Sequence, residues 1–303
     1  MRNASRIYDS EEQSKVREVK AHCTLWHTSR LRATRRMMPH LPNCALVGEP
    51  PYREMEQNLP LLAVITATFF AAGLVKGVTG MGLPTVAMGV LGAFLSPLAA
   101  ASLLLVPSFV TNVWQLFAGP RFGALVQRLW PMMLTIVVSA FLGSSLLTGS
   151  DTETTTTALG IALVVYAAYT LIARPLRVPA RLERLLSPLV GLITGLITGG
   201  TGVFVIPAVP YLQSLGLEKD DLVQALGLSF TVSTIALAIG LGWNGGIASD
   251  GWLTSVLAVI PALIGMQVGQ AIRTRISPLI FRRVFLLFLL LLGLQMASRP
   301  LFV

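Results

Sequence analysis

The sequence has few of the side chains on which most enzymes and metal sites depend. Only 12% of its 303 residues are charged, and its two cysteines and three histidines all precede residue 54. The rest of the chain can therefore hold no disulfide, no thiolate or imidazole metal site and no imidazole proton relay. The stretch around Lys76-Gly77 lacks the spacing of a nucleotide-binding P-loop. We expect no catalytic residue, no bound metal and no cofactor.

Long apolar runs fill the chain after its first 54 residues. Hydrophobic residues make up 53% of the sequence, and the mean hydropathy is +0.70. A soluble domain usually carries about a quarter charged residues. Runs such as Leu98 to Ala118 reach the length of about 20 residues that a membrane-spanning helix needs. The sequence therefore predicts an all-α polytopic protein embedded in a lipid bilayer.

Residues 1–54 are polar and rich in arginine, unlike the remainder. The net charge is +5 for residues 1–53 and +4 for residues 54–303. No apolar core of a signal peptide precedes Leu59. We interpret residues 1–54 as a disordered basic extension or an upstream mis-start, with the membrane part beginning at Met55. Because the later basic residues lie between apolar runs, where orientation signals are found, we expect no nucleic-acid binding.

The membrane part contains two copies of one unit of about 120 residues. Four landmarks recur at a nearly constant shift, which is hard to obtain by chance in apolar sequence. Gly80 and Gly82 match Gly200 and Gly202 at a shift of 120, Ser108-Phe109 matches Ser229-Phe230 at 121, and Trp130 and Gly143 match Trp252 and Gly265 at 122. We expect residues 55–173 to form the first copy, 174–187 a basic cytoplasmic linker and 188–303 the second copy.

Each copy opens with a stretch broken by glycines, at 59–95 and 187–216. The second stretch, of about 30 residues, is too short for two full spans. A broken helical hairpin, shielded from lipid by protein, fits it better. Three apolar segments follow in each copy, at 98–118, 130–148 and 156–173 and at 222–242, 252–271 and 281–298.

The placement of charge indicates how the copies are oriented. If each opening stretch makes no net crossing, each copy crosses the membrane three times and the copies are inverted. With the linker in the cytoplasm, the basic loops are cytoplasmic and the loop with Asp151 and Glu153 is outside, as the positive-inside rule requires. Parallel copies, the alternative, leave one basic loop outside. A cytoplasmic signal from a C-terminal reporter would contradict the inverted arrangement.

Several segments together resemble the TauE/SafE family of membrane permeases. They are GLVKGVTGMGLP and SLLLVPSFVTNVWQLF in the first copy, and GLITGLITGGTGVFVIP and ALGLSFTVSTIALAIG in the second. The resemblance covers about residues 57–298. It implies a bacterial inner-membrane protein built from tandem copies, which exports or takes up sulfite, sulfoacetate or related small organic anions. Many members carry a near-continuous run of glycines, which Met81, Leu83 and Pro84 interrupt here.

Broken helices and a buried cation both favour an anion site. The N-termini of broken helices carry partial positive charge, and glycines let an anion approach the backbone. Lys76 lies in an apolar run without a neighbouring carboxylate, so an anionic substrate suits it, although snorkelling to the interface is the alternative. Hydroxyl and amide groups that share a helix face either bind anion oxygens or join helices. The predicted substrate-binding residues are Lys76, Gly77, Gly80, Gly82, Ser108, Thr111, Asn112, Gly199, Gly200, Gly202, Ser229 and Ser233.

The sequence thus predicts a permease that moves a small anion such as sulfite or sulfoacetate across a bacterial inner membrane, in the direction of export. A transporter or channel for a small carboxylate or another solute is the alternative. A membrane enzyme is less favoured, because the apolar runs lack an acid, a base and a metal ligand. A homo-oligomer is compatible with the sequence.

Overall fold

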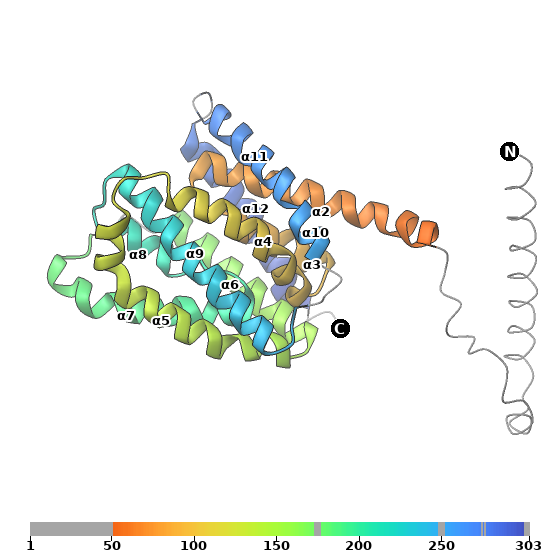
Figure 1. Cartoon of the computed structure of the whole chain (residues 1–303), viewed down its shortest axis with the longest axis horizontal. Coiled ribbons are helices and arrows are strands. Elements are labelled where there is room, and N and C mark those ends of the chain that lie inside the picture. The colour runs from red at the N-terminus through yellow and green to blue at the C-terminus, as the bar shows by residue number, and fades with distance from the viewer. Residues whose placement is uncertain (1–50, 173–176, 248–251, 274, 276, 300–303) are drawn as a thin grey trace, which may run out of the picture. The chain divides into compact units, whose positions relative to one another are not determined.

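The computed structural model describes residues 51–172, 177–247, 252–273, 275 and 277–299, and within these ranges the regular structure is helical (Figure 1). The chain separates into two compact units, residues 1–59 and 60–303. Of the first unit, the described residues 51–59 are helical. The predicted basic extension therefore lies almost wholly outside the described residues, and the features below belong to the second unit.

The described helices follow one another with short connections. In chain order they are α2 (Pro51–Thr79), α3 (Leu83–Phe94), α4 (Pro97–Leu116), α5 (Phe122–Gly149), α6 (Thr152–Ile172), α7 (Ala180–Thr201), α8 (Ala208–Ser214), α9 (Lys219–Trp243), α10 (Trp252–Leu257), α11 (Val259–Ile272) and α12 (Pro278–Ser298).

Eight helical stretches in the described part of the chain are long and apolar enough to cross a membrane. They are α2 from Leu59, α4, α5, α6, α7 from Arg181, α9, α10 together with α11, and α12 from Ile280. The prediction of a polytopic all-α membrane protein is therefore confirmed. The first helix of each opening stretch provides a membrane-length segment of 21 residues. This first arm of the hairpin is therefore longer than the second, whereas a symmetric hairpin would have two equal arms.

Each opening stretch nevertheless turns back on itself as a helical hairpin. The first ends its long arm beside the end of α4, where the Gln115 side-chain amide donates to the Gly80 carbonyl at 2.9 Å. From there α3 leads back to the start of α4. In the second, α8 returns to the start of α7, because the Val178 amide donates to the Ser214 carbonyl at 3.0 Å.

The two hairpins turn near opposite ends of α4. The first turn, at Gly80, lies by Gln115. The second turn, at Gly202, lies by Ala101, since a Cβ at Gly202 would be 3.4 Å from the Ala101 Cβ. These two positions of α4 are 14 residues apart, or about 21 Å along a helix. Inverted copies require such an arrangement, although the duplication itself and the placement in the membrane stay predictions.

Glycines permit the close helix contacts that hold the hairpins in place. On α7, the faces of Gly191 and Gly195 meet the backbone of α5 at Met132 and Ile136. On α2, Gly73 meets the backbone of α11 at Ala262. Small residues are the usual means of close helix packing in a bilayer, where the hydrophobic effect does not drive helices together.

Tryptophans lie toward both ends of the helices, with their side chains turned outward. Trp114 and Trp130 are 59% and 57% exposed near the end of α4 and the start of α5, and Trp243 and Trp252 are 78% and 49% exposed at the opposite end. Aromatic side chains at the two membrane interfaces have this distribution.

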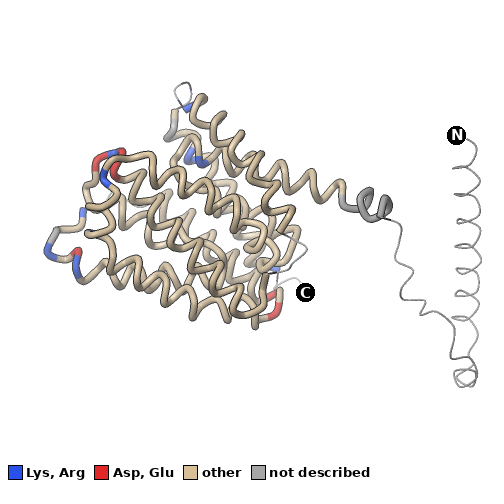
Figure 2. The backbone as a smooth tube through the Cα atoms, viewed as in Figure 1, with Lys and Arg blue, Asp and Glu red and all other residues tan. Residues whose placement is uncertain are grey.

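Charged residues lie at or near the ends of the described helices, and the middles of these helices carry none (Figure 2). The starts of α5, α7 and α9 meet at one end, through Arg128 with Glu183 and Arg121 with Asp221. We call this the basic end. The start of α12 with Arg282 and Arg283 belongs to it as well, because the Phe285 ring lies against Gly82 in the first turn. The positive-inside rule would place this end in the cytoplasm.

Candidate substrate site

Lys76 is buried in the last turn of α2, with only 3% of its surface exposed. Its Nζ atom donates to the Thr111 Oγ1 atom at 3.2 Å and to the Asn112 Oδ1 atom. Both acceptors lie on α4. The side chain therefore does not snorkel to an interface, which was the alternative explanation for a lysine in an apolar run.

The charge of Lys76 has no counter-ion among the described residues. The buried or half-buried carboxylates at the basic end are engaged elsewhere, Asp221 with Arg121 and Glu183 with Arg128. Two neutral acceptors and the negative end of the α2 dipole compensate part of the charge. A buried cation without an opposite charge costs several kcal/mol, so the site favours an anion as a ligand.

One face of α4 supplies the polar groups around Lys76. Ser108, Thr111, Asn112 and Gln115 are all buried, with spacings of three and four residues. Asn112 links a third helix to the site, because its Nδ2 atom donates to the Thr234 Oγ1 atom of α9 at 3.3 Å. The site thus lies where α2, α4 and α9 meet.

Three predicted site residues have buried hydroxyls that lack a hydrogen-bond partner within the described part of the chain. They are Ser108 on α4 and Ser229 and Ser233 on α9. A buried polar group without a partner costs about 1–3 kcal/mol, and an anion would satisfy it. The structure joins Lys76 directly to Thr111 and Asn112, whereas no hydrogen bond between described residues joins it to the three serines.

The glycine break follows Lys76 by one turn. Gly80 has φ 77° and Gly82 has φ 104°, a left-handed backbone that side chains with a Cβ rarely adopt. The chain can therefore reverse here and begin α3 at once, with Pro84 in the first turn. The positive end of the α3 dipole and the Lys76 ammonium both lie next to this break.

The second break has the same local structure, at a different register from the one expected. Thr79 and Thr201 each end a helix, and each hydroxyl donates to the carbonyl four residues earlier and accepts from the amide two residues later. Gly202 has φ 72°, whereas Gly200 is helical. The local structure of Thr79-Gly80 thus resembles that of Thr201-Gly202, at a shift of 122 residues, and the duplication itself stays a prediction.

Close helix packing explains why two other predicted site positions, Gly77 and Gly199, are glycines. A Cβ at Gly77 would collide with the backbone of α11 at Met266, and one at Gly199 would collide with α5 at Ala140. Gly200 faces open space, since the nearest atom to its Cβ position is a Leu146 methyl at 3.9 Å. A substrate-binding role for these three glycines stays a prediction.

Sequence reasoning missed Thr79 and Thr201, the threonines that end α2 and α7. It also missed the position on α7 that corresponds to Lys76. Counting back three residues from Thr79 gives Lys76, and counting back three from Thr201 gives Thr198. Thr198 is fully buried, and its hydroxyl donates to the Thr194 carbonyl at 2.7 Å. The repeated Thr-Gly pair was the signal that could have revealed this match. The first hairpin thus carries a cation three residues before its threonine, and the second carries a hydroxyl.

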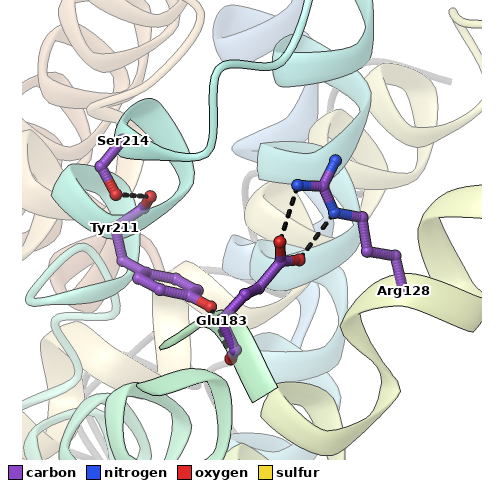
Figure 3. A network of polar contacts seen from close by, with 4 residues as sticks. All are labelled: Arg128, Glu183, Tyr211 and Ser214. Atoms are coloured by element: carbon purple, nitrogen blue, oxygen red, sulfur yellow. Dashed lines mark hydrogen bonds and ion pairs between the residues drawn. The ribbon is translucent and has the colours of Figure 1, made fainter. Parts of the chain in front are cut away.

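A polar network at the basic end ties the second hairpin to α5 (Figure 3). Arg128 binds the Glu183 carboxylate with two hydrogen bonds, at 2.6 and 2.8 Å. The Tyr211 hydroxyl donates to the Glu183 carbonyl at 3.3 Å, and the Ser214 hydroxyl donates to the Tyr211 carbonyl at 2.6 Å. Burial raises the pKa of Tyr211, so its phenol stays a neutral donor.

The types of polar side chain that the described residues bring together indicate which ligands the site suits. No group of histidine, cysteine, aspartate and glutamate side chains within them is arranged to hold a metal ion. The fold does gather the Lys76 ammonium and the unpartnered hydroxyls of Ser108, Ser229 and Ser233, which are donors suited to anion oxygens.

Comparison with known proteins gives a family for this chain. No curated protein and no solved structure matches it. The family described as sulfite exporter TauE/SafE matches residues 65–296, which include all the predicted site residues and most of the chain. The protein is a multi-pass membrane protein and belongs to the TauE/SafE sulfite exporter family, a family of membrane transporters.

Proposed function

We propose that this protein is a permease for a small anion, such as sulfite, sulfoacetate or a related organosulfur compound, in a bacterial inner membrane. The observation that carries the proposal is the buried Lys76, which is hydrogen-bonded to two neutral acceptors and unpaired with any described carboxylate. An anion would supply the missing negative charge. Export from the cytoplasm fits the family, whose description names sulfite export.

The polar groups near Lys76 suit the oxygen atoms of a sulfonate or sulfite. Lys76 would share its ammonium protons between Thr111, Asn112 and the anion. The unpartnered hydroxyl of Ser108 lies one turn before Asn112 on the same face of α4 and can donate to a second oxygen. The first turn of α3 adds a favourable dipole. Discrimination then rests on charge and on hydrogen-bond donors, with few acceptors that would attract a cation.

The opposed hairpins suggest how a bound anion changes sides. Transporters with inverted repeats hold the substrate between two halves and open alternately to either face. Here α4 and α9 form the shared centre, and the two hairpins reach it from opposite ends. The anion would carry its own charge across with Lys76 as a fixed counter-ion.

The experiment that tests this function is the thermal unfolding of the purified protein with a panel of anions. The panel contains sulfite, sulfate, thiosulfate, sulfoacetate, taurine and short carboxylates. A ligand that binds only the folded state at about 100 times its Kd stabilises by about 2.7 kcal/mol, which raises the unfolding temperature by roughly 5–10 °C in a protein of this size. We expect such a shift for a sulfur anion with the wild type and a smaller one with Lys76→Ala.

Three other results of the anion panel would change the proposal. A shift of undiminished size in Lys76→Ala would overturn the role of this lysine. A shift for carboxylates alone would keep an anion permease but replace the substrate class. The absence of any shift would contradict the proposal of a small-anion site.

A further inference from the structure

A cavity of about 430 Å³ lies at the basic end, between α6, α8 and the start of α12. Most of its wall is apolar and includes Val165, Ile206 and Pro210. Pockets that bind small molecules have volumes of about 300–1,000 Å³ and a few polar groups in an apolar lining. The cavity is separate from the contacts of Lys76, and the polar network of Tyr211 and Ser214 forms one of its sides.

Among the described residues that line this cavity, Arg282 is the one cation. Arg282 is half-buried, and the ion pairs between described residues at the basic end involve Arg121 and Arg128 instead. Thr170 also lines the cavity, and its hydroxyl is buried without a hydrogen-bond partner in the described part of the chain. A guanidinium, a free hydroxyl and an apolar wall together suit an organic anion with a small apolar body.

One wall of the cavity, at Tyr166, contacts the glycine break. Tyr166 lines the cavity, and its hydroxyl lies 3.9 Å from the Met81 sulfur. Met81 stands between Gly80 and Gly82, and the Gly80 amide donates to the Lys76 carbonyl at 2.7 Å. Met81 and Tyr166 therefore separate the cavity from the glycine break that follows Lys76.

We propose that this cavity is a second anion site, at which the organic anion docks on Arg282 before it moves to Lys76. The charged group would lie on the guanidinium, and the apolar body would lie against Val165, Ile206 and Pro210. The loading role rests on the proposed function, whereas anion binding at Arg282 can be tested without it. An anionic phospholipid headgroup shares the same chemistry, and the experiment below distinguishes it from a soluble anion.

The test uses a thiol reporter inside the cavity. The only cysteines of the chain are Cys23 and Cys44, so Cys23→Ser and Cys44→Ser give a background without thiols. Gln213→Cys, on the α8 side, then places one thiol in the cavity wall and keeps Arg282 and Thr170, and Tyr169→Cys provides a second reporter in case the first fails to fold. The probes are two methanethiosulfonates that differ in charge, one with an ethylsulfonate group and one with an ethyltrimethylammonium group.

We expect the anionic probe to react faster than the cationic one, after correction for their rates with a free thiol. Electrostatic focusing in a cleft changes local concentrations by about tenfold or more. Arg282→Gln should therefore lower the anionic-to-cationic rate ratio by roughly fivefold to tenfold. The neighbouring Arg283 is exposed and does not line the cavity, so Arg283→Gln should leave the ratio unchanged.

An equal ratio in Arg282→Gln and Arg283→Gln would overturn the proposal. Sulfoacetate should slow the labelling of the reporter protein that keeps Arg282, but not that of the same protein with Arg282→Gln. Protection by phosphatidylglycerol in mixed micelles without protection by sulfoacetate would also overturn it, since the occupant would be lipid. An Arg282-dependent ratio combined with a thermal shift of equal size in the wild type and Lys76→Ala would contradict the proposed function and leave the anion site standing.

Discussion

At the scale of single residues, Lys76 and Asn112 form the contact that distinguishes this site. The amide oxygen of Asn112 accepts from the ammonium, and its nitrogen donates to Thr234. Asn112 therefore orients Lys76 without neutralising it. A carboxylate at this position would neutralise the lysine, and no substrate would be needed to do so.

Asn112→Asp should mimic a permanently bound anion. The new carboxylate gives Lys76 a counter-ion at hydrogen-bond distance, so we expect an unfolding temperature raised by about 3 °C or more without ligand. We also expect the loss of any further stabilisation by the anion panel. Thermal unfolding of the purified variant measures both effects.

Asn112→Leu is the matched control for that change. It removes an acceptor of the buried ammonium and should lower the unfolding temperature, because a less-solvated buried charge is costly. If Asn112→Asp still responded to anions as the wild type does, the anion would have to bind away from Lys76.

Several residues of the site could be predicted from the sequence, for identifiable reasons. A lysine in an apolar run is conspicuous, and spacings of three and four placed Thr111 and Asn112 on one face before any contact was known. Tyr166 and Arg282 could not be found in this way. Their relevance comes from a cavity between α6, α8 and α12, segments that are far apart in the sequence.

At the scale of helices, the opening stretches could be predicted as broken hairpins, but their unequal arms could not. Glycine patterns mark a break without showing which glycine takes the left-handed backbone. Thr79 and Thr201 mark the glycine that does so. Each hydroxyl donates to a carbonyl before the break and accepts from an amide after it. In local structure Gly80 therefore resembles Gly202, two residues beyond the expected Gly200.

Substitutions of two adjacent glycines of α7 distinguish the effect of close helix packing on stability from the effect of helix propensity. Gly199→Ala should destabilise the protein by about 1–3 kcal/mol, because the new methyl group meets the α5 backbone at Ala140. Gly200→Ala, one residue away, meets open space and should be neutral or stabilise the helix by up to about 1 kcal/mol. Thermal unfolding in detergent compares the two.

Equal effects of these two substitutions would contradict the close contact of α5 with α7. That contact holds the long arm of the second hairpin, so the Gly199→Ala variant should also lose anion transport in proportion to the loss of folded protein. A folded Gly199→Ala variant that is inactive would instead favour a direct role of Gly199 in substrate binding, as the sequence first suggested.

At the scale of the whole molecule, two hairpins that turn at opposite ends of α4 enclose one buried cation. The cation breaks the symmetry of the pair, because Lys76 corresponds to Thr198 in the second hairpin. The basic end collects arginines at its surface, and the cavity with Arg282 opens there. An anion would thus meet one positive charge at the end of the bundle and another within it.

The measurement that tests the central claim most directly is the flux of labelled sulfite and sulfoacetate in proteoliposomes, for the wild type, Lys76→Met and Arg283→Gln. Methionine fills the space of the lysine and removes a buried charge, so Lys76→Met should fold at least as stably as the wild type. We predict that its flux falls at least about tenfold, equivalent to about 1.4 kcal/mol, while Arg283→Gln transports normally. Wild-type flux by a well-folded Lys76→Met protein would contradict the account.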